Sequence, residues 1–283
     1  MILKTPRKFL TVLHRQDNGD VEGITACAGF ELGNWRVKKL SEHLINWLPH
    51  FALRSNEIED IGLENPGDLI KQAAYRVFKE SASKGRGEIG ELLLHILAVT
   101  EYDARTFVAR LFYKMRSNDQ VTGFDSALVT YSEESNEVEL WLGEAKFYED
   151  TQDAVKKALA SLKGHLEEGF LEETKILIGP KIEPSSPGYD LLQWLFEDGN
   201  TLDELISRIV VPVLIASESV AASDYDGDNE KYNELVIKEF DYISKRLGKS
   251  AIAREVRVVA IYVPLVSKET LEAEFVKKLR VFQ

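Results

Sequence analysis

GFDSALVTYSEESNEVELWLGEAKFY, residues 123–148, is the stretch that decides the fold of this chain. Phe124 to Tyr131 and Glu137 to Tyr148 are rich in apolar and aromatic residues, and the second run alternates in the manner of a half-buried strand. Between them stands a polar segment, Ser132 to Asn136, of the kind that forms turns. The stretch therefore predicts two strands paired as a hairpin.

The predicted hairpin gathers three ionisable side chains. Pairing about the turn places Asp125 roughly opposite Glu144, and opposite residues share a face with Cβ atoms about 4.5–5.5 Å apart. Lys146 is two residues beyond Glu144, so it shares that face, beside apolar Leu142. Two facing carboxylates repel each other unless something neutralises them. A divalent metal ion is the usual solution, and oxygen ligands suit magnesium, with manganese as the alternative.

The arrangement Asp125…Glu144-x-Lys146 on a hairpin resembles the core of the PD-(D/E)XK nucleases. The resemblance implies that the carboxylates hold magnesium and that the lysine positions or activates the attacking water. It also implies an α/β fold, in which a mixed sheet is flanked by helices and a mostly helical addition precedes it. DNA is then the expected substrate.

The flanking sequence is more particular. Several runs of the sequence are similar to the HamA family of the Hachiman anti-phage system. They are GFD and WLGEAKFYED in the hairpin, WLPHFALRSNEIED and RGEIGELLLH upstream of it, and VPVL and AIYVPL downstream. The similarity covers roughly residues 35–283. It implies a defence nuclease that works with a companion helicase, HamB. We divide the chain into an N-terminal region, residues 1–66, and a nuclease-like domain, residues 67–283.

A further acid is expected on the predicted helix GEIGELLLHILAV. Glu88 and Glu91 are three residues apart and share one face of it. The resemblance implies that one of them faces the metal, with Glu91 the first choice and Glu88 the second. The residues alone favour acids that stabilise the helix dipole. His95, one turn beyond Glu91, is expected to be a packed histidine.

Two glycine and acid motifs carry no chemistry. Gly85, Gly87 and Gly90 spell G-x-G-x-x-G, but a helix rather than a strand precedes them and neighbouring acids would repel a pyrophosphate. The acids from Asp224 to Asp228 do not fit a calcium loop, because Leu235 stands where a Glu is required.

Basic residues suggest contacts with nucleic acid. The helical pattern from Glu101 to Arg116 is a candidate for phosphate contacts, with a solvated face as the equal alternative; its cations are Arg105, Arg110, Lys114 and Arg116. Lys156 and Lys157, on the helix expected after the hairpin, are candidate DNA contacts.

Several other elements are predicted from local patterns. They are a helix from Trp35 to Leu48 that Pro49 ends, a helix capped by Thr151, a strand from Lys175 to Ile182, and a buried strand from Ile209 to Ala216 whose Pro212 indicates an edge or a bulge. The first of these helices, with the N-terminal region, is a candidate docking surface.

Composition limits the classes of function. The net charge of −12 argues against holding nucleic acid by bulk electrostatics, although a metal site adds to that sum and a basic partner could supply the phosphate-binding surface. A single cysteine, Cys27, excludes an internal disulfide and favours a cytoplasmic setting. The longest apolar run, Ile209 to Ala216, is too short for a membrane span.

Two alternatives to a nuclease stay open. One is a nuclease-fold subunit that has lost catalysis and serves as a binding or scaffold component of a DNA-processing complex. The other is an unrelated acidic protein in which Glu144 and Lys146 merely pair across a strand face.

Overall fold

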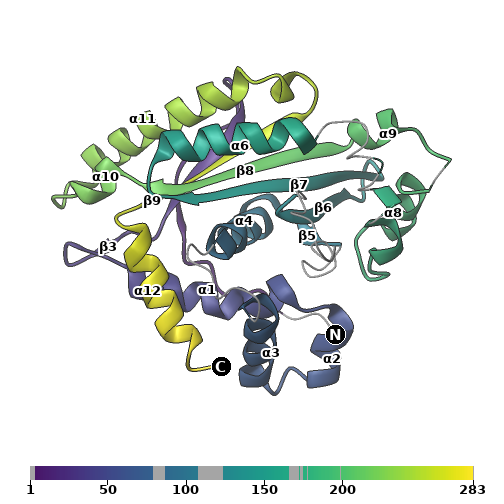
Figure 1. The fold of residues 1–283 in the computed structure, drawn as a ribbon, viewed down its shortest axis with the longest axis horizontal. Helices are drawn as coiled ribbons and strands as arrows, with labels where there is room; N and C mark the ends of the chain where they lie inside the picture. The colour runs from purple at the N-terminus through teal and green to yellow at the C-terminus, as the bar shows by residue number, and fades with distance from the viewer. Residues whose placement is uncertain are drawn as a thin grey trace.

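A mixed seven-stranded sheet forms the centre of the protein (Figure 1). The computed structural model describes residues 4–78, 87–107, 124–165, 172, 175–176, 178–197 and 199–282. In spatial order the strands of the sheet are β1 (Thr11–Gln16), β2 (Glu22–Cys27), β9 (Arg257–Leu265), β8 (Ile209–Glu218), β7 (Glu137–Tyr148), β6 (Ser126–Ser132) and β5 (Arg105–Thr106). A separate small hairpin consists of β3 (Phe30–Glu31) and β4 (Asn34–Trp35).

The middle of the sheet is parallel and its edges are antiparallel. β2, β9, β8 and β7 run parallel to one another, while β1, β6 and β5 pair antiparallel with their neighbours. β8 and β9 read IVVPVLIASE and RVVAIYVPL, and nearly all of their residues are buried. Continuous apolar runs of this kind are what parallel strands covered on both faces require.

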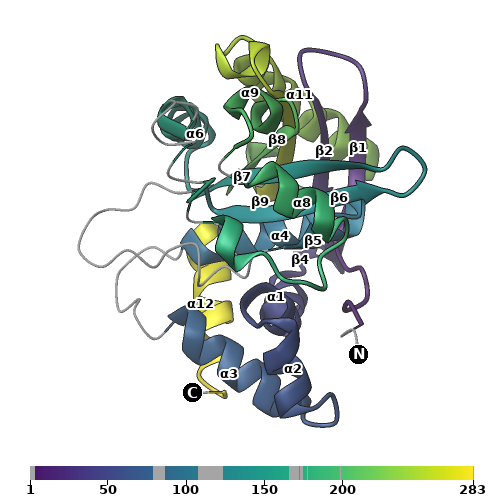
Figure 2. The same ribbon diagram turned by 90° about the vertical axis from the view of Figure 1, so that its right-hand side faces the viewer.

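Helices cover both faces of the sheet, as both ribbon views show (Figures 1 and 2). One face carries α1 (Val37–Ala52), α2 (Ser55–Ile61), α3 (Pro66–Phe78), α4 (Gly87–Tyr102) and α12 (Lys268–Leu279). The other carries α6 (Thr151–His165), α8 (Tyr189–Leu195), α9 (Leu202–Ile206), α10 (Val220–Ser223) and α11 (Asn229–Gly248). Each layer buries its own apolar core, and the predicted mixed α/β fold is confirmed.

The N-terminal stretch contributes to the sheet itself. β1 pairs with β2 and β2 pairs with β9, so two strands of residues 1–66 belong to the same sheet as the hairpin β6–β7. The first predicted helix runs past Pro49 to Ala52, so the expectation that Pro49 ends it is wrong. The carbonyl of Pro49 still accepts a hydrogen bond from the Leu53 N–H at 3.0 Å, which closes the last turn although the ring itself donates none.

Two further element predictions are wrong. The stretch from Lys175 to Ile182 is not a strand where it is described: residues 175, 176 and 178 are helical and Gly179–Lys181 is a 3₁₀ turn. Helix α4 ends at Tyr102, so the helix predicted from Glu101 does not continue, and Arg105 lies in the short edge strand β5. The remainder of that prediction, including Arg110, Lys114 and Arg116, lies outside the described residues.

Pro212 lies in the middle of the sheet rather than at an edge. β8 pairs with β7 on one side and β9 on the other, and Pro212 is opposite Val259 of β9. On the β7 side the regular pairing is interrupted between Val210 and Val213, where Pro212 stands. The missing N–H of proline is therefore accommodated by a local gap in one ladder.

Side-chain caps fix several helix starts. Thr201 forms a capping box with Glu204, and Asp228 caps α11 through the N–H groups of Glu230 and Lys231. At α6 the cap is Asp150, whose carboxylate accepts the Asp153 N–H at 2.7 Å, and not Thr151 as predicted. Asp228 thus ends an exposed loop and caps the helix that follows it.

Candidate active site

The β6–β7 hairpin brings Asp125 and Glu144 together in the predicted register. The ladder between the two strands ends at the pair Ser126 and Gly143, and the next residue along each strand is Asp125 on one side and Glu144 on the other. The Asp125 N–H donates to the Gly143 carbonyl at 2.7 Å. One step further along β7, the Ala145 N–H donates to Asp125 Oδ2 at 3.0 Å. At the start of β6, the carboxylate of Asp125 thus accepts the hydrogen bond from β7 that a backbone carbonyl accepts elsewhere in the ladder.

Gly143 is the residue on which this corner closes. A Cβ atom at this position would lie 2.4 Å from Ser126 Oγ, 2.7 Å from Leu94 Cδ2 and 3.1 Å from Pro212 Cγ. These neighbours belong to β6, α4 and β8, so three elements pack against Gly143 too closely to leave room for a side chain. The close approach explains why a glycine directly precedes Glu144.

Glu144 and Lys146 form a buried ion pair. The side chain of Glu144 is 2% exposed and that of Lys146 is 17% exposed, and the ammonium donates to Glu144 Oε1. Burial raises the pKa of Glu144 above its ordinary value, and the charge of Lys146 offsets this only in part. Burial works to lower the pKa of Lys146, but the neighbouring carboxylates of Glu144 and Asp125 hold that pKa above its usual value.

A serine that sequence reasoning missed also contacts this pair. Ser161 of α6 hydrogen-bonds the Glu144 carboxylate, which works to lower the pKa of Glu144. Its place in the pattern offered a signal, because it follows the buried Ala154 and Ala158 at helical spacing. A polar residue at an inward position of a helix indicates a polar partner beneath it.

Helix α4 lies against β7 closely enough for Glu91 to act on the same pair. Gly90 permits the approach, since a Cβ there would lie 3.0 Å from the Cβ of Phe147. Glu91 is 6% exposed, and its charge raises the pKa of Glu144. Glu88 is half-buried at the start of the helix. Of the two acids, Glu91 is the one whose field reaches Glu144.

The fit to a metal ion is partial. Among the residues that the structure describes, no three His, Cys, Asp or Glu side chains gather into a group that could hold one. Asp125 and Glu144 are two carboxylates at the same end of the hairpin, and carboxylate oxygens suit a hard cation such as Mg²⁺. Lys146 already donates to one oxygen of Glu144, so a metal ion bound there would share the carboxylate with the ammonium group.

The histidines His43 and His95 of this layer are buried and packed against aromatic rings. Burial lowers the pKa of His95 to about 3 and that of His43 to about 4, so both are neutral at pH 7. The ring of His95 contacts Trp47 and Phe51 edge-on, with centroids 6.0 and 5.5 Å apart. The prediction of a packed His95 is confirmed. Cys27 is also buried, and burial raises the pKa of its thiol.

Three of the candidate phosphate contacts, Arg105, Lys156 and Lys157, are among the described residues and lie on the surface. Lys156 and Lys157 are exposed on α6, the helix that also carries Ser161. Arg105 is exposed and forms an ion pair with Asp103 at 2.6 Å. Arg105 is thus partly neutralised, whereas the two lysines stand on the helix that covers β7.

The fold and the acid–lysine corner define a class: a mixed α/β sheet flanked by helices, consistent with a nuclease-like fold. The model of the HamA family matches residues 7–279, nearly the whole chain. The chain therefore belongs to the HamA family and is associated with Hachiman defence. No curated protein matches the sequence. Within the described ranges, none of the helices is both long and apolar enough to cross a bilayer.

Proposed function

We propose that this chain is a magnesium-dependent deoxyribonuclease that acts as the effector of a defence system. The observation that carries the proposal is the buried Glu144–Lys146 pair beside Asp125, at the end of the β6–β7 ladder, in a chain of the HamA family. Charged groups at 2% and 17% exposure are costly to bury. Perturbed carboxylates and lysines of this kind cluster at functional sites.

Each residue of the corner has a proposed task. Asp125 and Glu144 would hold the cation, with Glu91 as the further acid and Glu88 as the alternative to it. A bound magnesium ion supplies Lewis-acid stabilisation of the phosphoryl oxygens and a water of lowered pKa. Lys146 would offset the charge that develops on the phosphate and position the attacking water.

A helicase partner follows from the charge of the chain and from its family. With a net charge of −12, the protein as a whole repels the DNA backbone. HamB, the companion expected from the family, would bring its own cationic channel and raise the effective concentration of DNA at the site. We propose a stable complex of the two proteins in the cytoplasm, with Lys156 and Lys157 contacting DNA and the N-terminal region contributing to docking.

A catalytically inactive scaffold is the second candidate. The observation that favours it is that Lys146 is already neutralised by Glu144 and that no three metal-ligating side chains are gathered among the described residues. In this case Glu144 and Lys146 would act as a structural pair within the complex.

Plasmid cleavage by the purified pair of proteins, with and without ATP, separates the two. The nuclease proposal expects cleavage with Mg²⁺ or Mn²⁺, none with a chelator, and none by Glu144→Gln. Glu91→Gln should lose most of the activity, whereas Glu88→Gln is the matched control on the same helix. Cleavage by Glu144→Gln at the wild-type rate would refute the proposed site. A folded, complex-forming wild type that never cleaves would favour the scaffold.

A further inference from the structure

A polar cavity lies at the end of β7 away from the candidate active site. It has a volume of about 510 Å³, and its charged lining consists of Glu137, Glu139, Arg208, Arg254, Glu255 and Arg257. Glu137 and Glu144 are seven residues apart on one strand, which corresponds to roughly 23 Å. The cavity is therefore separate from the candidate active site and has no part in its proposed chemistry.

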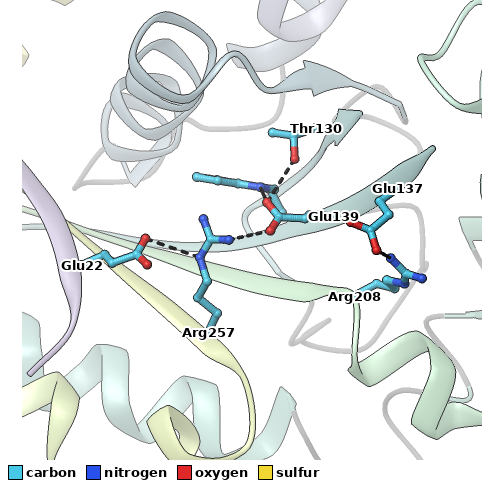
Figure 3. Close-up of polar contacts among 7 residues, drawn as sticks. Glu22, Thr130, Glu137, Glu139, Arg208 and Arg257 are labelled. Atoms are coloured by element: carbon cyan, nitrogen blue, oxygen red, sulfur yellow. Dashed lines mark hydrogen bonds and ion pairs between the residues drawn. The ribbon is translucent and has the colours of Figure 1, made fainter. Parts of the chain in front are cut away.

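One side of this cavity is already satisfied by its own contacts (Figure 3). Arg257 forms ion pairs with Glu139 and, at 3.4 Å, with Glu22. Glu139 also accepts hydrogen bonds from Thr130 at 3.1 Å and from the Trp141 indole at 3.3 Å. Both oxygens of Glu139 are thus in use. This group forms a fixed wall rather than a set of binding groups.

Two other guanidinium groups remain available. Within the described ranges Arg208 has one ion pair, with Glu137 at 3.4 Å, and the two side chains are 36% and 58% exposed (Figure 3). Ion pairs this exposed contribute little and exchange readily for another anion. Arg254 is exposed and forms no ion pair with any residue in the described part of the chain. Guanidinium groups match the geometry of phosphate oxygens and bind them through paired hydrogen bonds.

The rest of the lining suits the remainder of a nucleotide. Ile206 and Ala253 are half-buried residues of the wall and offer apolar surface. Glu137 and Glu255 offer acceptors for hydroxyl or amino groups. Cavities of about 300–1,000 Å³ with apolar walls and a few polar groups are typical of small-molecule sites.

We propose that this cavity binds a nucleoside monophosphate, with its phosphate on Arg208 and Arg254. A small ligand fits better than a nucleic-acid strand, because three carboxylates line the same cavity and would repel the successive phosphates of a strand. The two arginines suffice for one phosphate group, and the carboxylates then face the sugar and the base.

Isothermal titration calorimetry on the full chain tests the proposal. The probes are AMP, GMP, CMP and UMP, with inorganic phosphate, adenosine and a short single-stranded oligonucleotide for comparison. At least one monophosphate should bind more tightly than inorganic phosphate or adenosine. Arg254→Ala and Arg208→Ala should each weaken binding by about tenfold or more, as removal of a charge-assisted hydrogen bond predicts. Arg280→Ala, which removes an exposed arginine after α12, is the matched control and should bind as the wild type.

Three results would overturn the proposal. The first is that no monophosphate binds at millimolar concentration. The second is that both arginine variants bind the monophosphate as tightly as the wild type does. The third is that Arg254→Ala weakens binding of the oligonucleotide as much as it weakens binding of the monophosphate. Far-ultraviolet circular dichroism and the thermal midpoint establish that the variants are folded. Glu144→Gln should keep nucleotide binding, so failure of the nuclease proposal leaves this result unaffected.

Discussion

Replacing Lys146 by methionine should destabilise the protein through its partner. Methionine keeps most of the apolar stem but removes the ammonium group, which leaves the Glu144 carboxylate buried at 2% exposure without its cation. Breaking a buried pair by removing one member costs about 3–5 kcal/mol. We expect about 3 kcal/mol, because Ser161 still donates to Glu144 and lessens the penalty. For a chain of 283 residues this corresponds to a fall of roughly 5 °C in the unfolding midpoint.

The pH dependence of this loss gives the reasoning a second test. Without Lys146 the folded-state pKa of Glu144 rises further above its ordinary value of 4.5. Below that ordinary value both states are protonated and the penalty is absent, and it grows as the pH rises toward the folded-state pKa. The Lys146→Met variant should therefore lose more stability relative to the wild type at pH 7 than at pH 5.

Urea denaturation at the two pH values, in chelator, is the assay. The double variant Glu144→Gln/Lys146→Met removes both charges and should recover most of the lost free energy of unfolding at pH 7. Lys157→Met, on the exposed face of α6, is the control and should change little. If Lys146→Met unfolds at the wild-type urea concentration, or if the double variant is as unstable as the single one, the buried pair does not have the energetics described.

Two further substitutions, each with a matched control, test the contacts around the same corner. Gly90→Val should destabilise the protein by about 1–3 kcal/mol, because α4 must move away from Phe147. Gly87→Ala is the control and should not destabilise it, since a Cβ there meets nothing within 4 Å; thermal unfolding distinguishes the two variants. Asp125→Ala should lower the free energy of unfolding, measured by urea denaturation, by about 1–3 kcal/mol, because the Ala145 N–H loses its acceptor. Asp125→Asn keeps an acceptor oxygen and should stay near the wild type. Equal losses in the two variants would contradict this explanation.

The hairpin was predictable because its information is local. Alternation along residues 137–148 and the polar turn before it set the pairing, and the pairing alone places Asp125 opposite Glu144. The helix bearing Glu91 was also predictable from periodicity. That Glu91 rather than Glu88 acts on Glu144 depends on the close approach at Gly90, which the resemblance anticipated but the residues alone did not.

Elements that depend on distant partners were predicted less well. β1 and β2 belong to the sheet because β2 lies beside β9, more than 200 residues later in the chain, and no local pattern carries that pairing. Lys175 to Ile182 looks like a strand, but tertiary context overrides its β propensity where it is described. The cavity around Arg254 likewise assembles from three separated segments and has no motif.

Gly143 has a consequence for the length of the hairpin turn. Side chains along a strand alternate between faces, so a slip of one residue in β7 would present Leu142 or Glu144 where only a hydrogen atom fits between β6, α4 and β8. The glycine therefore acts as a register lock, independent of the turn at residues 133–136. Insertions and deletions in that turn should be absorbed as a change in loop shape, while Asp125 and Glu144 stay in step. The number of residues between the two carboxylates can therefore change with the length of the turn, although their pairing cannot.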